Sequence, residues 1–106
     1  MSYDVDIGEF SAGYTSNVAT MFHKHIRHGD KTGVQALDGL TGRTAGVILS
    51  HAIEALHAES CSYERPGLSH YDSPNGWGNA TGAVLFLARI LGACHRYPRS
   101  IVRVSY

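Results

Sequence analysis

The sequence has few cysteines, no excess charge of either sign and no long hydrophobic run, and each shortage excludes a class of protein. Two cysteines among 106 residues are too few for the disulfide framework of a small secreted domain. Nine basic residues balance nine acidic ones, so the formal net charge is zero, which argues against binding to long DNA or RNA. The longest apolar stretch, residues 83–94, is interrupted by Arg89 and is shorter than the roughly 20 residues that span a bilayer.

Length and N-terminal composition predict a single cytoplasmic domain. A chain of 106 residues encloses one hydrophobic core, so we expect one domain over residues 1–106. The N-terminal segment carries Asp4, Asp6 and Glu9, which a secretory or transit peptide does not tolerate. Cys94 lies in an apolar run and is expected to be a reduced thiol in the core.

Period-two alternation predicts one strand near each end of the chain. The apolar side chains that share a face are Tyr3, Val5 and Ile7 in the first strand, and Val102, Val104 and Tyr106 in the second, which covers residues 101–106. The second strand follows Tyr97-Pro98, a pair of residues that stops a helix.

Three helices are expected between the strands, because apolar residues recur there every three or four positions. The first covers residues 17–27, the second residues 44–58 and the third residues 81–96. The buried stripe predicted for the second helix is Ala45, Ile48, Leu49, Ala52, Ile53 and Leu56. We therefore predict an α+β domain with the order β-α-α-α-β, in which the two terminal strands pair and the three helices pack together.

The third helix is apolar over most of its circumference, so it needs cover on more than one side. A two-stranded sheet offers little cover and is marginal by itself. We therefore expect a homo-oligomer that buries this helix or the exposed strand edge. The alternative is that the two long loops, residues 28–39 and 61–78, fold over the helix.

The loop 61–78 contains the only tryptophan, which lies between two glycines just before the third helix. A tryptophan held in this way, here Trp77, can stack on a nucleobase. The alternative is that Trp77 fills the core from a tight turn, with Asn75 and Asn79 as turn and cap residues.

The start of the second helix combines groups that suit a phosphate. Free backbone N–H groups, the Thr41 and Thr44 hydroxyls and the Arg43 guanidinium converge there if the helix begins as predicted. The segment differs from a P-loop, because it lacks the lysine and the glycine spacing and no strand precedes it. The alternative is ordinary capping by Thr41, with Arg43 in solvent.

The histidines do not form a recognisable catalytic or metal-binding motif. His23, His25 and His28 make an H-x-H-x-x-H string, but no Cys, Asp or Glu completes the spacing of a zinc site. His57 and Cys61 lie at helical spacing, yet no third residue is placed to orient them. We therefore predict no metal, no cofactor and no catalytic residue.

Several short motifs follow one another along the chain. They are Gly13-Tyr14-Thr15-Ser16-Asn17-Val18, Met21-Phe22, Leu40-Thr41-Gly42-Arg43-Thr44-Ala45, Asn75-Gly76-Trp77-Gly78, Leu91-Gly92-Ala93-Cys94 and Val102-Arg103-Val104-Ser105. With these motifs the chain resembles a family of small phage and prophage proteins over most of its length. It departs from the family at Gly13, where an Asn is usual, at Phe22, where a Trp is usual, and at Asn79-Ala80, where an Asp-Tyr pair is usual.

The resemblance implies a binding function, because the family's context is similar to that of phage proteins that trap nucleotide second messengers of bacterial antiphage defence. The implied ligand is a cyclic di- or oligonucleotide or an ADP-ribose derivative, held without cleavage in the host cytoplasm. The residues that the resemblance and the motifs assign to this ligand are Tyr14, Thr15, Ser16, Asn17, Arg43, Asn75, Gly76 and Trp77.

Two other functions stay open at this point. One is a small hydrolase or phosphodiesterase that uses His57, His70 or the histidines of the first helix. The other is a phage inhibitor that binds a host protein. Loss of ligand mass would support the enzyme, and a stable host partner would support the inhibitor.

Overall fold

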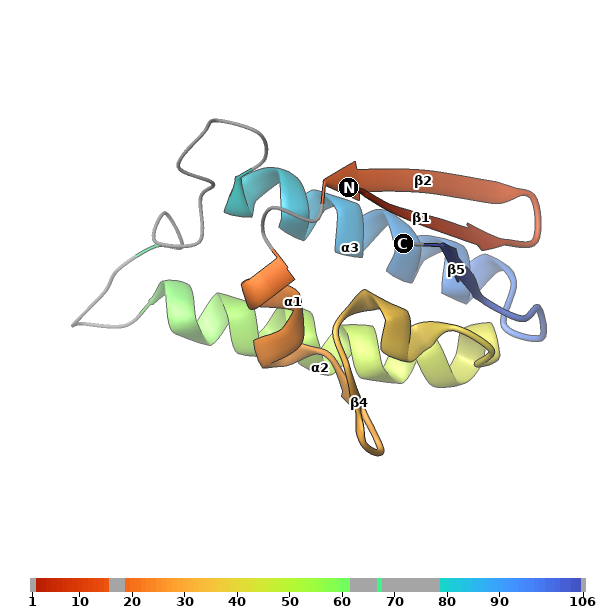
Figure 1. The fold of residues 1–106 in the computed structure, drawn as a ribbon, viewed down its shortest axis with the longest axis horizontal. Coiled ribbons are helices and arrows are strands. Elements are labelled where there is room, and N and C mark those ends of the chain that lie inside the picture. The colour runs from red at the N-terminus through yellow and green to blue at the C-terminus, as the bar shows by residue number, and fades with distance from the viewer. Residues whose placement is uncertain (1, 16–18, 62–66, 68–78, 106) are drawn as a thin grey trace.

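The computed structural model of the chain describes residues 2–15, 19–61, 67 and 79–105. It is a small α+β fold, as predicted (Figure 1). The elements are β1 (Ser2–Ile7), β2 (Phe10–Thr15), α1 (Ala19–His25), β3 (Arg27–His28), β4 (Lys31–Thr32), the 3-10 helix η2 (Val34–Leu37), α2 (Gly42–Ser60), α3 (Ala80–Arg96) and β5 (Arg103–Ser105).

The main sheet is antiparallel and has the strand order β2-β1-β5, so the terminal strands pair as expected. The strand β2 was not predicted. It follows β1 through a two-residue turn in which Gly8 has a φ of 58°, a conformation that favours glycine. Ala12 and Gly13 are weak strand formers, and they mask the alternation of this segment.

The C-terminal strand is shorter than the predicted residues 101–106. Ile101 makes an isolated bridge to Thr41, and the ladder with β1 begins only at Arg103. Backbone bonds to the segment before α2 occupy Val102, which is why the start of the predicted strand turns away from the sheet. Residue 106 lies outside the described residues.

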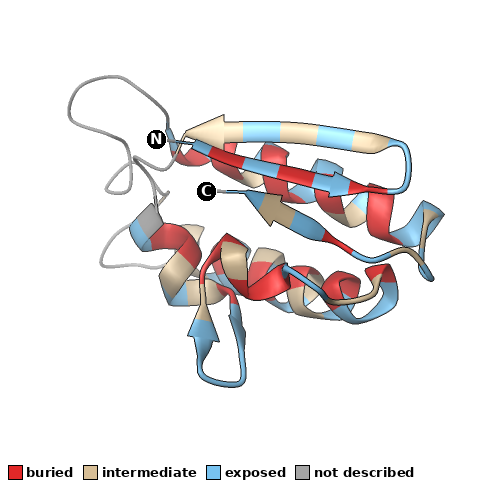
Figure 2. Ribbon diagram, turned by 45° about the vertical axis from the view of Figure 1, so that its right-hand side comes forward, coloured by how far each residue is buried: buried red, intermediate tan, exposed pale blue. Residues whose placement is uncertain are grey.

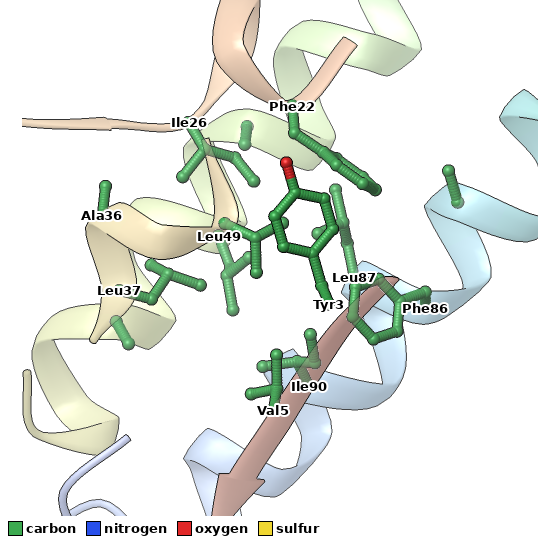
Figure 3. Packing of buried hydrophobic residues seen from close by; sticks show 14 of the residues in the cluster. Tyr3, Val5, Phe22, Ile26, Ala36, Leu37, Leu49, Phe86, Leu87 and Ile90 are labelled. Atoms are coloured by element: carbon green, nitrogen blue, oxygen red, sulfur yellow. The ribbon is translucent and has the colours of Figure 1, made fainter. Parts of the chain in front are cut away.

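Two packed layers enclose the core. The helices α2 and α3 run antiparallel and side by side, and the sheet packs against α3 (Figure 1). Along β1 buried and exposed positions alternate, which places Tyr3, Val5 and Ile7 inward as predicted (Figure 2). Figure 3 shows Tyr3 in the middle of the core, where its ring meets Phe22 edge-on at 5.7 Å between centroids.

The two long helices match their predicted apolar faces. Every residue of the stripe predicted for α2 is buried or half-buried. In α3, Phe86, Leu87 and Ile90 are buried between the sheet and α2. The side chain of Leu85 is 60% exposed, so part of the apolar surface of α3 has no cover within the described residues.

The predicted loop 28–39 is wrong in detail, because most of it is structured. The strands β3 and β4 form a short hairpin, and η2 follows it with Val34, Ala36 and Leu37 buried. Two-residue strands and a single helical turn are too short to show a periodic pattern. The predicted loop 61–78 lies outside the described residues apart from Cys61 and Gly67.

The helix α1 ends two residues before the end of the predicted range 17–27, whose first two residues lie outside the described residues. It covers Ala19–His25, and the chain then enters β3. Met21, Phe22 and Ile26 are fully buried. Within the described part of the chain, no helix combines the length and the apolar composition needed to cross a bilayer.

Candidate functional site

The first turn of α2 is fully capped from within the chain. The backbone N–H groups of Gly42 and Arg43 donate to the carbonyl oxygens of Ser100 at 2.8 Å and Pro98 at 3.0 Å. The N–H of Thr44 donates to Oγ1 of Thr41, the N-cap residue, at 3.4 Å. The idea that free N–H groups hold a phosphate here is therefore wrong, and the capping alternative is confirmed.

The Arg43 side chain nevertheless lines a groove of about 340 Å³ between the first turns of α2 and the last turn of α3. The groove is lined by Arg43, Gly46, Val47, Ser50, Cys94, His95 and Pro98. Its size lies at the lower end of the roughly 300–1,000 Å³ typical of small-molecule sites. It has one permanent cation, one imidazole, one hydroxyl and an apolar wall.

The charge of this groove favours an anion. No carboxylate is among the lining residues, and within the described residues Arg43 has no ion-pair partner. Both Arg43 and His95 are exposed, so a ligand can reach them. A guanidinium without an internal carboxylate can form paired hydrogen bonds to a phosphate.

Tyr14 connects two elements of the fold. Its ring stacks on Phe86 at 5.7 Å between centroids, with 24° between the planes. Its hydroxyl donates to the Asn79 carbonyl oxygen and accepts from the Asn79 N–H, both at 3.0 Å. A methyl group on Gly82 would collide with the same hydroxyl. Tyr14 therefore ties β2 to the start of α3.

The predicted ligand residues do not converge in one chain. Tyr14 and Thr15 lie beside the first turn of α3, whereas Arg43 lies beside its last turn. The helix has 17 residues, which at 1.5 Å per residue is a length of about 25 Å. The remaining predicted residues, Ser16, Asn17, Asn75, Gly76 and Trp77, lie outside the described residues.

The histidines of the first helix stabilise the fold. His23 Nδ1 lies 2.8 Å from Thr32 Oγ1, and His25 Nε2 lies 2.6 Å from an oxygen of Glu59, which also binds Lys24. His28 is exposed on β3. Within the described residues, no group of three metal-ligating side chains converges.

The pair His57 and Cys61 lies at the end of α2. The His57 carbonyl oxygen accepts a hydrogen bond from Ser60 Oγ at 2.7 Å, and Cys61 is the exposed C-cap residue. Cys61 Sγ lies 3.9 Å from Ser60 Oγ, and within the part of the chain that the structure describes no hydrogen bond joins the His57 and Cys61 side chains. His70, the other histidine considered for catalysis, lies outside that part.

Two groove residues, Ser50 and His95, were not predicted. Ser50 follows Arg43 by seven positions, so the two share one face of α2. This spacing could have predicted from the sequence that Ser50 lies beside Arg43. His95 comes from the far end of α3, and only the antiparallel packing of the two helices brings it to Arg43.

The fold and the groove define the chain as a small α+β protein with an open cationic groove on a pair of antiparallel helices. No protein-family model, no curated protein and no solved structure matches the chain.

Proposed function

We propose that the protein binds a nucleotide-like small molecule in the Arg43 groove and holds it without converting it. We further propose that this ligand is a nucleotide second messenger of antiphage defence, such as a cyclic di- or oligonucleotide or an ADP-ribose derivative. The observation that carries the proposal is the Arg43 guanidinium, which among the described residues has no ion-pair partner and no carboxylate beside it in the groove. The resemblance to small phage proteins supplies the biological setting.

The lining groups match the parts of a nucleotide. Arg43 and His95 can bind a phosphate, and the Ser50 hydroxyl can bind a ribose or a base edge. The side chain of Val47 is 55% exposed and, with Pro98, offers an apolar wall to a base. The groove is open, so a ligand with several nucleotides can extend beyond it.

These groups suit retention rather than turnover. The chemistry of a guanidinium suits binding, because it stabilises negative charge but does not transfer a proton in a reaction. Between Ser50 and His95, both described in full, no hydrogen bond forms that could activate the hydroxyl as a nucleophile. Binding of an anion by fixed cations requires neither step.

A thermal-shift panel tests the proposal. The purified protein is heated with cyclic mono-, di- and trinucleotides and with ADP-ribose derivatives, because a ligand that binds only the folded state raises the melting temperature. We expect a shift with one or a few members, and intact ligand by mass spectrometry after denaturation. A shift with a cleaved product would instead identify a hydrolase, and no shift across the panel would contradict nucleotide binding.

Arg43→Ala locates the site. Loss of a charge-assisted hydrogen bond should weaken binding of the nucleotide found in the panel by about 1.5 to 3 kcal/mol, which is on the order of 10- to 100-fold. The matched control is Arg103→Ala, which removes an exposed arginine from the outer face of β5. Titration calorimetry should show weaker binding for Arg43→Ala only. Equal affinity of both variants and the parent protein would remove Arg43 from the site.

A further inference from the structure

A second arginine, Arg99, lies next to Arg43 at one end of the groove. The N–H of Arg43 donates to the carbonyl oxygen of Pro98 at 3.0 Å. The N–H of Gly42 donates to the carbonyl oxygen of Ser100 at 2.8 Å. Arg99 stands between these two acceptors in the chain, so its backbone is held against the first turn of α2.

Close packing fixes Arg99 in this position. A Cβ on Gly42 would collide with the carbonyl oxygen of Tyr97, two residues before Arg99, so a glycine is needed at this contact. The ring of Tyr97 packs in turn against the β1–β2 turn, where a Cβ on Gly8 would lie 2.7 Å from it. The backbone that carries Arg99 is therefore in place before a ligand binds, which lowers the entropy cost of binding.

The positive charge at this end of the groove is exposed and is not neutralised by an ion pair. Among the described residues, neither Arg43 nor Arg99 pairs with a carboxylate, and both are exposed. The segment from residue 79 to residue 105 contains four arginines and no acidic residue. His95 is also exposed and lines the groove together with Arg43. Protonation of His95 would add a third positive group.

Arg43 occupies a position that is unfavourable for a cation. It is the second residue of α2, where the helix dipole places partial positive charge, and the first turn has no acidic residue to offset it. Arg99 adds a second positive charge close by, and like charges repel each other. Proteins keep such unfavourable features mainly at functional sites. An anion with more than one negative charge that contacts both guanidinium groups removes this repulsion.

The other end of the groove carries no charge. Its lining on α2 beyond Arg43 consists of Gly46, Val47 and Ser50. Ser50 follows Arg43 by seven positions on α2, which is about 10 Å along the helix axis. The groove therefore suits a ligand whose negative charge is concentrated at one end, with an uncharged part that reaches toward Ser50.

We infer that the ligand is a diphosphate, in which two phosphate groups share one bridging oxygen. One phosphate binds Arg43 and His95, and the other binds Arg99, since each guanidinium can donate two hydrogen bonds to phosphate oxygens. A cyclic dinucleotide fits less well, because a ribose separates its phosphates and each of them carries a single charge. Only the nucleoside part of the ligand rests on the proposed nucleotide binding. Among the ligands proposed above, the diphosphate selects the ADP-ribose derivatives.

Inorganic pyrophosphate and phosphate test the diphosphate site without a nucleoside. Titration calorimetry of the whole chain, with EDTA present so that no metal bridges the anion, should show binding of pyrophosphate about tenfold tighter or more. Citrate carries its charge on separated carboxylates and should bind no better than phosphate. Equal affinity for pyrophosphate and phosphate would overturn the inference, and so would equal affinity for pyrophosphate and citrate.

Arg99→Ala assigns the second phosphate. It should weaken pyrophosphate binding about tenfold or more and leave phosphate binding nearly unchanged. Arg99→Gln, which keeps most of the side chain without its charge, should have the same effect. The matched control is Arg96→Ala, because the Arg96 guanidinium lies over the Tyr97 ring, at 5.9 Å from its centroid, and does not line the groove. With folding confirmed by circular dichroism, equal losses in Arg96→Ala and Arg99→Ala would overturn the site.

The nucleotide panel separates this inference from the proposed function. If pyrophosphate binds as expected and no nucleotide raises the melting temperature, the diphosphate site stands and nucleotide binding is wrong. If a cyclic dinucleotide binds and pyrophosphate does not compete with it, nucleotide binding stands and the diphosphate inference is wrong.

Discussion

Burial decides the chemistry of single residues in this chain, and the two cysteines show it most clearly. Cys94 is 1% exposed between α3 and α2, and loss of hydration raises the pKa of its thiol from 9.0 to about 11. Cys61 is exposed at the end of α2. The same side chain is thus an inert core group at one position and an accessible thiol at the other.

Alkylation should therefore label one cysteine only. We expect native protein treated with iodoacetamide to gain one adduct per chain, on Cys61, and denatured protein to gain two. Peptide mass spectrometry identifies the site. Labelling of Cys94 in the native protein at the rate of Cys61 would show that the packed interface between α2 and α3 opens readily.

The raised pKa of Cys94 also predicts a pH dependence. The unfolded chain releases the Cys94 proton near pH 9 and the folded chain only near pH 11. The stabilisation by this thiol is therefore complete below pH 9 and is lost as the pH rises from 9 to 11. Urea titrations should show a steeper loss of stability over that interval in the parent protein than in Cys94→Ala. Equal slopes would contradict the assignment.

At the scale of elements, α2 and α3 are each fixed at the first turn by groups from outside the helix. The side chain of Asn79 caps α3 by accepting a hydrogen bond from the Gly82 N–H at 2.7 Å. The sequence had offered Asn79 as a cap residue in the alternative interpretation of the Trp77 segment. The hydroxyl of Tyr14 holds both backbone groups of Asn79, so the cap is also joined to β2. At α2, Thr41 and the carbonyl groups after α3 play the same part.

Tyr14→Phe isolates this connection between β2 and α3. The ring can still stack on Phe86, but two hydrogen bonds to Asn79 are lost, which should lower the free energy of unfolding by about 1 to 2 kcal/mol. The control is Tyr97→Phe, whose hydroxyl makes no hydrogen bond among the described residues. Chemical denaturation measures both. If Tyr14→Phe keeps full stability but loses nucleotide affinity, Tyr14 is a ligand residue after all.

At the scale of the whole molecule, one core joins the sheet to all three helices. Phe22 of α1 is fully buried and lies between Tyr3 of β1 and Phe86 of α3, at 5.7 and 6.1 Å between ring centroids. The ion pair of Lys24 with Glu59 and the hydrogen bond between His25 and Glu59 then attach α1 to the end of α2. The short helix α1 is stable because of these contacts, since seven residues do not form a lasting helix in water.

A chelator should not change the thermal stability of the protein. His23 and His25 bind Thr32 and Glu59, and in the described part of the chain no metal-ligating cluster forms. We expect the same melting temperature with and without excess EDTA in differential scanning fluorimetry. A fall of several degrees, reversed by added zinc, would show that a metal contributes to folding.

The sequence predicted an element correctly where its periodic apolar face extends over several repeats. The stripe from Ala45 to Leu56 defined α2, and the alternation of Tyr3, Val5 and Ile7 defined β1, because each repeats one buried contact several times. β2 was missed although Gly8 marks its turn, since Ala12 and Gly13 weaken the strand signal. Arg43 was found as a candidate residue from the motif, but its role at a capped helix end could not be read from it.

The sequence by itself determined the class of the fold, the pairing of the terminal strands and the helical face that each apolar stripe buries. These follow from local periodicity, which the backbone geometry of helices and strands imposes on any chain. Only the tertiary structure decided which ends of the helices meet. Antiparallel packing of α2 and α3 brings His95 to Arg43 and separates both from Tyr14, because contacts between distant segments depend on how whole faces fit.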